Sequence, residues 1–199
     1  MLRRIVDIVA SLFLLALLTP VLTIAVIAVW LGSGWPVFFG HERVGQHGRR
    51  FRCLKLRTMM PDAEGRLERE PALKRTYVSN GFKLPNGKDP RVTKVGRVLR
   101  RTYIDEIPQL FNVLDGSMTL VGPRPIVPEE LSHYGDRASE LLQAKPGLIG
   151  AWTSRGRRRP DYPIRAQLEL EYVRNRTALR DLGLLLRSIP VVLRGQGDG

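Results

Sequence analysis

Cysteine and histidine are scarce in this sequence of 199 residues, which contains one cysteine, Cys53, and three histidines, His41, His47 and His133. A single cysteine excludes a disulfide framework within the chain and any zinc site built from several cysteines. The histidines lack the spacing of a metal-binding pair such as His-x-x-x-His, and we assign them no chemistry. Cys53 lies where apolar and basic residues alternate, and this pattern predicts a buried or half-buried thiol.

Acidic residues are also few, because 19 aspartates and glutamates face 32 lysines and arginines and leave a formal net charge of +13. This excess predicts an anionic partner, which would be a nucleic acid, an anionic membrane surface or a phosphorylated substrate. The sequence has no recognised nucleic-acid-binding motif and no basic strand interleaved with aromatic residues. We therefore predict no nucleic-acid partner. Repeats and low-complexity tracts are absent too, and the length suits one domain.

Charge is missing altogether from residues Ile8 to Leu31, which are almost wholly apolar. At about 1.5 Å per residue, a helix over this run is long enough for a bilayer core of about 30 Å. A signal peptide fits poorly, because the run is too long and no small-x-small cleavage site ends it. Thr19 and Pro20 lie near its middle. The proline predicts a kink, and the threonine hydroxyl can help to satisfy the carbonyl that the proline leaves without a donor.

The charges that flank this run decide between topologies. A spanning helix has its excess of lysine and arginine on the cytoplasmic side only. Here both flanks are basic, through Arg3 and Arg4 before the run and Arg43, Arg49, Arg50 and Arg52 after it. We therefore predict a re-entrant hairpin over residues 1–33, bent at Thr19-Pro20, with both ends on the cytoplasmic face. A single span is the second interpretation, and a buried helix of a soluble domain is the third.

The segments that follow the apolar run have local patterns that predict their secondary structure, but their functions stay open. Residues 51–57 predict a short strand after a glycine turn, with Arg52, Lys55 and Arg57 pointing outward, either as a solvated face against lipid headgroups or as phosphate contacts. Residues 61–88 are polar and are interpreted as a mobile lid or as an ordinary surface excursion, with a short exposed helix expected over Asp62 to Arg69. Helices are predicted over 128–143 and 164–187.

The stretch from Arg97 to Pro125 places two adjacent carboxylates, Asp105 and Glu106, in an otherwise apolar helical frame. Pro108 costs no helical hydrogen bond if the helix starts near Asp105, and we prefer that start to one at Thr102. The free N–H groups of such a helix would then be a seat for phosphate. Spacing alone leaves a plainer interpretation open, in which Asp105 is only a cap and Glu106 a first-turn acid.

Residues 145–160 form a second basic stretch, rich in glycine. Backbone N–H groups there, together with Arg155 or Arg157, could grip a nucleotide diphosphate. The same residues could equally hold anionic lipid.

Several of these segments together resemble the bacterial sugar transferase family, the monotopic polyprenyl-phosphate phosphoglycosyl transferases. The resemblance rests on LRRIVDIVASLFLLALLTP, PVFF-HERVG-HG-FRCLKLRTM, DPRVTKVGRVLRRTYIDEIPQLFNVLDGSMTLVGPRP and KPGLIG, and it extends over essentially the whole chain. The DEIPQLFNVL…LVGPRP block is highly specific. The length is similar to that of small members that consist of the catalytic domain alone.

The resemblance implies a reaction and a place for it. Family members transfer a sugar 1-phosphate from a UDP-sugar to a polyprenyl phosphate, usually undecaprenyl phosphate, and release UMP at the start of exopolysaccharide, O-antigen or glycoprotein glycan assembly. It implies that Asp105 is the nucleophile, that Glu106 helps to hold Mg²⁺, and that Arg100 and Arg124 bind phosphate. Thr19-Pro20 takes the position of the family's hairpin break. The location implied is the cytoplasmic face of the bacterial inner membrane.

The sequence departs from the family at two places. Ser117 stands where an acid is common, so no role for that acid is carried over. Residues 150–157 read GAWTSRGR where the family usually has GWAQVNGR, which weakens the assignment of Arg155 to uridine or sugar recognition.

The complete expectation is a mostly helical α/β protein with three parts: the hairpin over 1–33, a compact cytoplasmic catalytic domain over 34–194 with a small sheet and interfacial amphipathic helices, and a frayed tail over 195–199. The rival hypotheses are a non-catalytic basic membrane adaptor for an acidic partner and a transferase without an enzyme intermediate. The oligomeric state stays open, with a dimer as one option.

Overall fold

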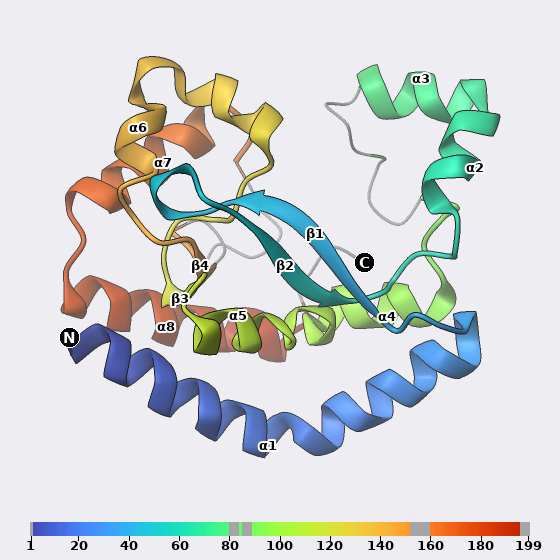
Figure 1. The fold of residues 1–199 in the computed structure, drawn as a ribbon, viewed down its shortest axis with the longest axis horizontal. Helices are drawn as coiled ribbons and strands as arrows, with labels where there is room; N and C mark the ends of the chain where they lie inside the picture. The colour runs from blue at the N-terminus through green and yellow to red at the C-terminus, as the bar shows by residue number, and fades with distance from the viewer. Residues whose placement is uncertain (1, 80–83, 85–88, 152–159, 196–199) are drawn as a thin grey trace.

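The computed structural model describes residues 2–79, 84, 89–151 and 160–195. A long N-terminal helix, α1 (Leu2–Ser33), lies beneath a body of shorter helices and two small two-stranded sheets (Figure 1). The fold is thus mostly helical with little sheet and a long apolar N-terminal helix, as the sequence predicts.

Helix α1 is continuous through Pro20, so the predicted helix-break-helix is wrong in its break. Figure 1 shows a bowed helix whose two ends turn toward the body. The Thr19 hydroxyl donates to the carbonyl of Leu15 at 2.6 Å, which is one residue before the carbonyl that the proline leaves without its helical donor. Side-chain and proline effects of this kind bend a helix without ending it.

Most of the apolar surface of α1 is exposed, and its buried residues are Asp7, Ser11, Ala25 and Val29. Within the described part of the chain, it is the one helix long and apolar enough to cross a membrane. A run of side chains such as Phe13 and Leu17, each more than half exposed, is costly in water, so this surface indicates association with lipid.

Polar contacts hold the first turns of α1 against the body. The Arg4 guanidinium donates to the carbonyls of Val113 and Leu114. The Asp7 carboxylate accepts hydrogen bonds from the Thr119 hydroxyl at 2.8 Å and from the backbone N–H of Leu120 at 3.0 Å. This buried acid is therefore satisfied by the body.

The last turn of α1 is held by the same body. The Arg57 guanidinium donates to the carbonyls of Ser33 and Gly34, both at 2.6 Å, and so satisfies orphan acceptors at a helix C-terminus. A hydrophobic cluster reinforces the contact; its members are Ala25, Val29, Val37, Leu56 and Leu99. Both ends of α1 are thereby fixed to one globular unit.

An antiparallel hairpin crosses the body, formed by β1 (Phe38–Val44) and β2 (Arg50–Leu56), with a short helical turn, η1 (Gln46–Gly48), between them. The predicted strand and glycine turn are confirmed. Because paired residues share a face and faces alternate along a strand, Arg43, Cys53 and Lys55 lie on the same side of the hairpin. The outward orientation predicted for Lys55 is wrong, since its side chain lines a pocket.

The central stretch forms α4 (Lys94–Thr102), a 3₁₀ turn η2 (Ile104–Glu106) and α5 (Gln109–Asp115). A second sheet follows, in which β3 (Thr119–Val121) pairs in parallel with β4 (Gly147–Ile149). The largest buried cluster joins α5, β3 and the C-terminal helices through Leu110, Val113, Met118, Tyr172 and Leu184. The site is built around this core.

The remaining helices differ from the sequence predictions at their boundaries. The helix predicted over 128–143 is a 3₁₀ segment, η3 (Pro128–Arg137), followed by α6 (Ala138–Leu141), because Gly135 adopts a positive φ of 53°. The helix predicted over 164–187 is two helices, α7 (Ile164–Arg174) and α8 (Ala178–Leu193). Thr177 caps α8 by accepting from the N–H of Arg180, and α8 then continues through Pro190.

Residues 61–88 include α2 (Ala63–Arg69) and α3 (Pro71–Ser79), which lie apart from the rest of the body in Figure 1. The short exposed helix predicted near Asp62 is present as α2. Of the predicted C-terminal tail, residues 196–199 lie outside the described residues.

Candidate active site

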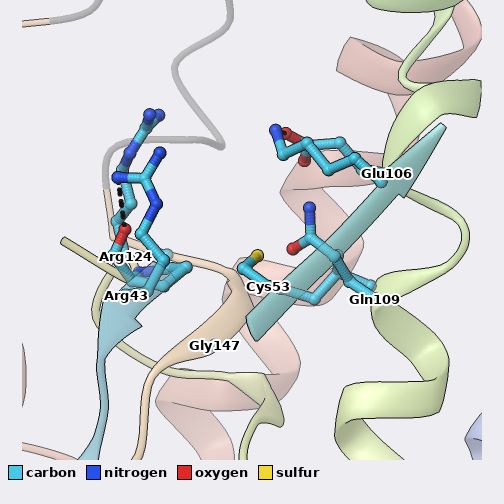
Figure 2. Close-up of a pocket in the computed structure, with 10 residues that line it drawn as sticks. Arg43, Cys53, Glu106, Gln109, Arg124 and Gly147 are labelled. Atoms are coloured by element: carbon cyan, nitrogen blue, oxygen red, sulfur yellow. Dashed lines mark hydrogen bonds and ion pairs between the residues drawn. The ribbon is translucent and has the colours of Figure 1, made fainter. Parts of the chain in front are cut away.

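A pocket opens between the hairpin, η2 and the second sheet. Its chemically functional lining residues are Arg43, Cys53, Lys55, Glu106, Gln109 and Arg124, and part of β4 with Gly147 also lines it. Figure 2 shows Arg43 and Arg124 together on one side of the pocket, Glu106 and Gln109 on the other, and Cys53 between them. Two arginines thus face Glu106, whose carboxylate is paired with Lys55, across the pocket.

The acid pair lies in η2, directly after Tyr103, which ends α4 in the left-handed conformation with a φ of 60°. The side chain of Glu106 lines the pocket and accepts a hydrogen bond from the Lys55 ammonium at 2.5 Å. Asp105 is buried beside it, with 6% of its surface exposed. The two carboxylates, adjacent in sequence, therefore have different environments.

The helix predicted to start near Asp105 begins later, at Gln109, with Pro108 as its N-cap residue. The N–H groups of Glu106 and Ile107 are already used, because they donate to the carbonyls of Tyr103 and Ile104 within the 3₁₀ turn. The predicted phosphate seat on free helical N–H groups is therefore wrong. Thr102 is not a start either, since it ends α4 and its hydroxyl donates back to Val98.

The electrostatics of Asp105 are dominated by its removal from water. Burial raises the pKa of Asp105 to about 6, Lys55 and Arg100 oppose this rise, and the negative charge of Glu106 adds to it. A carboxylate in this state is poorly solvated but still ionised at neutral pH, which is favourable for a nucleophile. Burial also raises the pKa of the Cys53 thiol, so this cysteine is a neutral group in the pocket wall.

Arg100 reaches the neighbourhood of the acids because α4 packs directly on the backbone after β2. A Cβ at Gly96 would lie 2.0 Å from the carbonyl oxygen of Thr58, so only glycine permits this approach. The Arg100 Nε then donates to the Thr58 hydroxyl at 2.8 Å. Arg100 is not among the lining residues of the pocket, but its charge lowers the pKa of Asp105, and its predicted role in phosphate binding stays a prediction.

Arg124 is positioned by a contact between two backbones. A Cβ on Gly147 would lie 2.0 Å from the N atom of Gly122, and the Gly147 N–H donates to the Pro123 carbonyl at 2.8 Å. The rigid Pro123-Arg124-Pro125 segment is thus fixed against β4, with the guanidinium lining the pocket. Arg124, for which the family resemblance implies phosphate binding, thus lies at the pocket; its role in binding stays a prediction.

A comparison with known proteins accounts for this constellation. The family model for bacterial sugar transferases matches residues 1–195. The chain belongs to this family.

Three relatives show the range of the family. An undecaprenyl-phosphate galactose phosphotransferase of Salmonella typhimurium is 43% identical over 98% of this chain and 41% of its own length. The exopolysaccharide production protein ExoY of Sinorhizobium fredii is 37% identical over 98% of this chain and 87% of its own length. A UDP-glucose:undecaprenyl-phosphate glucose-1-phosphate transferase of Caulobacter vibrioides is 38% identical over 96% of this chain and 69% of its own length. The chain thus spans about two fifths of the Salmonella relative.

Not every cation predicted for the site lies there. Arg57 does not line the pocket; its guanidinium caps the C-terminus of α1, so the structure gives it a supporting contact where a phosphate ligand was predicted. Arg155 and Arg157 lie outside the described residues.

Sequence reasoning missed two lining residues, Arg43 and Gln109. Arg43 had been counted only as a membrane-flanking charge, although it lies in the HERVG segment that carries part of the family resemblance. Gln109 lies four residues after Asp105 and directly follows Pro108, and this closeness to the acid pair is the signal in the sequence that could have placed it at the site.

The donor groups present suit magnesium better than zinc. No cluster of three or more histidine, cysteine or acidic side chains occurs in the described parts of the chain. Mg²⁺ needs only one or two carboxylates and completes its shell with water and substrate phosphates. The Glu106 carboxylate at the pocket surface, with Asp105 beside it, fits that demand.

Proposed function

We propose that this protein transfers a sugar 1-phosphate from a UDP-sugar to a polyprenyl phosphate, with release of UMP, through a covalent intermediate on Asp105. Family membership supports a sugar-phosphate transferase, and the printed activities of the Salmonella and Caulobacter relatives support undecaprenyl phosphate as the acceptor. The observation that supports the mechanism is the buried Asp105 carboxylate, whose pKa is raised by its removal from water. Asp105 is not itself a lining residue of the pocket, but it directly precedes Glu106, which lines the pocket opposite the arginines.

In the first half-reaction, a carboxylate oxygen of Asp105 attacks the β-phosphorus of the UDP-sugar. A bond forms between that oxygen and phosphorus, the bridging P–O bond to the α-phosphate breaks, and UMP leaves with the bonding electron pair. Lys55 and Arg100 keep Asp105 ionised by lowering its pKa against the effect of burial. Arg124 binds phosphoryl oxygens from the opposite wall.

In the second half-reaction, a phosphate oxygen of the polyprenyl phosphate attacks the phosphorus of the aspartyl phosphosugar. The Asp105–phosphorus bond breaks, the carboxylate is restored and a lipid diphosphosugar results. Bound Mg²⁺, held by Glu106, would supply positive charge that offsets the charge developing on phosphate oxygens. Because the displacement is split into two steps, the water-soluble donor and the lipid acceptor react one after the other at the same carboxylate.

The proposed membrane arrangement brings that acceptor to the pocket. Both ends of α1 are fixed to one globular body, which supports a helix that enters and leaves the same leaflet. Helix α8 supports an interfacial position, because exposed apolar side chains recur at helical spacing along it: Leu179, Leu182, Leu186, Ile189 and Leu193. Arginines spaced seven residues apart flank that row at Arg180, Arg187 and Arg194 and suit anionic headgroups. We place the body on the cytoplasmic face of the bacterial inner membrane.

The decisive experiment is to incubate the purified protein with UDP-sugars labelled in the sugar, with Mg²⁺ and without lipid. We expect a labelled protein and UMP at up to one equivalent. Borohydride reduction of an acyl phosphate converts aspartate to homoserine, so mass spectrometry of the reduced peptide should find homoserine at position 105. Asp105→Asn should abolish both the label and turnover with polyprenyl phosphate while the protein remains folded.

Glu106→Gln is the matched variant, because it removes the neighbouring carboxylate that lines the pocket. Reduction product at position 106 would overturn the assignment of Asp105. Turnover with lipid but no labelled protein would favour direct attack by the lipid phosphate. An Asp105→Asn variant with full UMP release would refute the covalent mechanism, and absence of any transfer with a broad UDP-sugar panel would support a membrane adaptor.

A further inference from the structure

Arg43 reaches the pocket wall through backbone contacts that join two distant segments. Val44, the next residue of β1, forms an isolated bridge with Ile126, and its N–H donates to the Ile126 carbonyl at 2.9 Å. The Arg43 Nη1 donates to the Pro125 carbonyl at 3.3 Å. The guanidinium therefore lies alongside Arg124, as Figure 2 shows.

Two guanidinium groups side by side in a poorly solvated wall repel each other. The side chain of Arg43 is only 15% exposed. Burial lowers the pKa of Arg43, and the charge of Arg124 lowers it further, so the two residues contribute an electrostatic cost that an anion between them would relieve. Both arginines line the pocket, so the repulsion between their guanidinium groups is located where a ligand can bind.

The acid nearest to Arg43 is Glu130, and it is shared. A Glu130 oxygen lies 3.7 Å from the Arg43 Nη1, while its other oxygen lies 3.3 Å from the Arg165 Nη1. Burial opposes ionisation of Glu130, but the charges of Arg165, Arg124 and Arg43 and the Val127 N–H together lower its pKa. Glu130 is thus a fixed anion that neutralises only part of the cationic wall.

The hydrogen-bond and ion-pair distances of Arg43 are longer than those of an arginine with a purely structural role. Its distances of 3.3 Å and 3.7 Å lie at or beyond the end of the hydrogen-bond range. Arg57, which caps α1, makes two contacts of 2.6 Å to carbonyl oxygens and does not line the pocket. Arg43 therefore has hydrogen-bonding capacity directed at the pocket that its protein contacts use only weakly.

We propose that Arg43 is a second phosphoryl-binding residue of the pocket, paired with Arg124, and that Glu130 is the positioning residue that holds its guanidinium toward the ligand. This inference rests on the proposed function for the identity of the ligand. The shared chemistry is a phosphoryl group, which comes either from the diphosphate of the sugar nucleotide or from the phosphate of the lipid acceptor. A paired arginine fork suits several phosphoryl oxygens at once.

Binding is tested first without turnover, by titrating the detergent-solubilised protein with UDP and with inorganic pyrophosphate in EDTA. Arg43→Met should weaken the binding of at least one of them by about tenfold or more, and Arg43→Lys should weaken it less, because lysine keeps the charge but loses the fork. Arg50→Met is the matched control. Arg50 is on the same hairpin, with a side chain that is 66% exposed and paired with Glu42, and it should change binding less than twofold.

Kinetics then identify the source of the phosphoryl group. A KM that rises for the UDP-sugar alone in Arg43→Lys assigns Arg43 to the donor, and one that rises for polyprenyl phosphate alone assigns it to the acceptor. Glu130→Gln should raise the same KM with a smaller effect on kcat, and this effect should disappear in an Arg43→Met background. A Glu130→Gln effect of equal size in both backgrounds would overturn the positioning role, because it would be structural.

The anion site and the proposed function fail separately. Folded Arg43→Met and Arg43→Lys proteins that bind UDP and pyrophosphate within twofold of the wild type, with unchanged KM values, would overturn the inference. Binding that depends on Arg43, in a protein that transfers no sugar phosphate to lipid, would leave the anion site standing and refute the transferase.

Discussion

Asp105 carries its charge where the fold excludes water, and this has a consequence for stability. Its folded pKa of about 6 lies above the ordinary value of 3.8, so the folded protein binds the proton more tightly than the unfolded chain does. The stabilising effect of protonation is complete below about pH 4 and is lost as the pH rises through about 6. At neutral pH the ionised acid therefore destabilises the fold, as expected of a group retained for chemistry.

Asp105→Asn should for this reason be more stable than the wild type at pH 8 and lose that advantage near pH 4. The difference between a folded pKa of about 6 and the ordinary value of 3.8 sets an upper bound of about 3 kcal/mol, or roughly 6–12 °C in Tm for a chain of this size. Thermal unfolding in detergent with EDTA, at pH 4 and pH 8, measures the difference. Asp62→Asn, at a side chain that is 60% exposed, is the matched control for the same substitution at the surface.

Equal Tm differences for Asp105→Asn at the two pH values would mean that the carboxylate is solvated, contrary to its burial. Asp105→Asn should lose activity at any stability, because it lacks the proposed nucleophile.

Single residues were predicted best where their chemistry is local. Two adjacent acids in an apolar frame favour a site, although spacing alone leaves a capping role open, and the phosphate role of Arg124 comes from the family resemblance. The roles of Arg43 and Arg57 were not accessible in this way, because both lie in basic stretches and only tertiary packing decides that one faces the pocket and the other caps α1. Asp105 is buried in a turn that follows Tyr103, whose backbone is in the left-handed conformation. No pattern in the sequence predicts that conformation.

At the scale of elements, the site depends on two places where backbones touch. The β3–β4 pairing requires Gly122 and Gly147, and the packing of α4 requires Gly96. These contacts explain why glycines flank the segments that carry Arg124 and Arg100. A side chain at any of them would separate an element from its neighbour and displace a cation of the site.

Gly147→Ala should therefore impair both folding and activity. The added Cβ would lie 2.0 Å and 2.5 Å from the N and Cα atoms of Gly122, so β4 must move. We expect the free energy of unfolding to fall by about 2 kcal/mol or more. The rate of UMP release should fall even at temperatures where the variant is fully folded, because Arg124 is displaced. Tm and a UMP-release assay measure the two effects.

Gly183→Ala is the matched control for this substitution. A Cβ at Gly183 in α8 would have nothing within 4 Å, and alanine favours a helix by up to about 1 kcal/mol. It should leave Tm unchanged or higher. A Gly147→Ala protein with wild-type Tm and activity would show that β3 and β4 do not need their close contact.

Element boundaries were less predictable than element existence. The strand, the turn at Gly45-Gly48 and the exposed helix near Asp62 follow from local patterns. The predicted helix break at Pro20 is wrong, because a proline removes one helical hydrogen bond but the helix can continue through it. The 3₁₀ turns near Asp105 and Pro128 were missed because the apolar spacing of a 3₁₀ segment resembles that of an α-helix over short lengths.

At the scale of the whole molecule, the arrangement of α1 governs where the catalytic body can lie. Basic and acidic groups near its start, and a helix cap at its end, contact the same body. We expect an apolar helix held at both ends by one polar body to keep those ends on the same face of a bilayer, because opposite faces would require charged groups in lipid. The two basic flanks of the run predict the same topology.

Cysteines introduced at Leu2 and Glu42 should consequently react from the cytoplasmic side only. Both positions are well exposed, whereas Cys53 is 2% exposed and gives little background labelling. An impermeant maleimide applied to inverted and to right-side-out vesicles measures the accessibility. The wild-type protein is the control, and labelling of the two cysteines from opposite sides would establish a true span.

Synthesis of the chain from its N-terminus gives the Asp7 contact a temporal meaning. The partners of Asp7 lie 112 and 113 residues downstream, so the ribosome must add all of these residues before the contacts can form. Until β3 exists, the Asp7 carboxylate lacks both of these donors. We therefore expect the first turns of α1 to take their final place against the body only after β3 has formed.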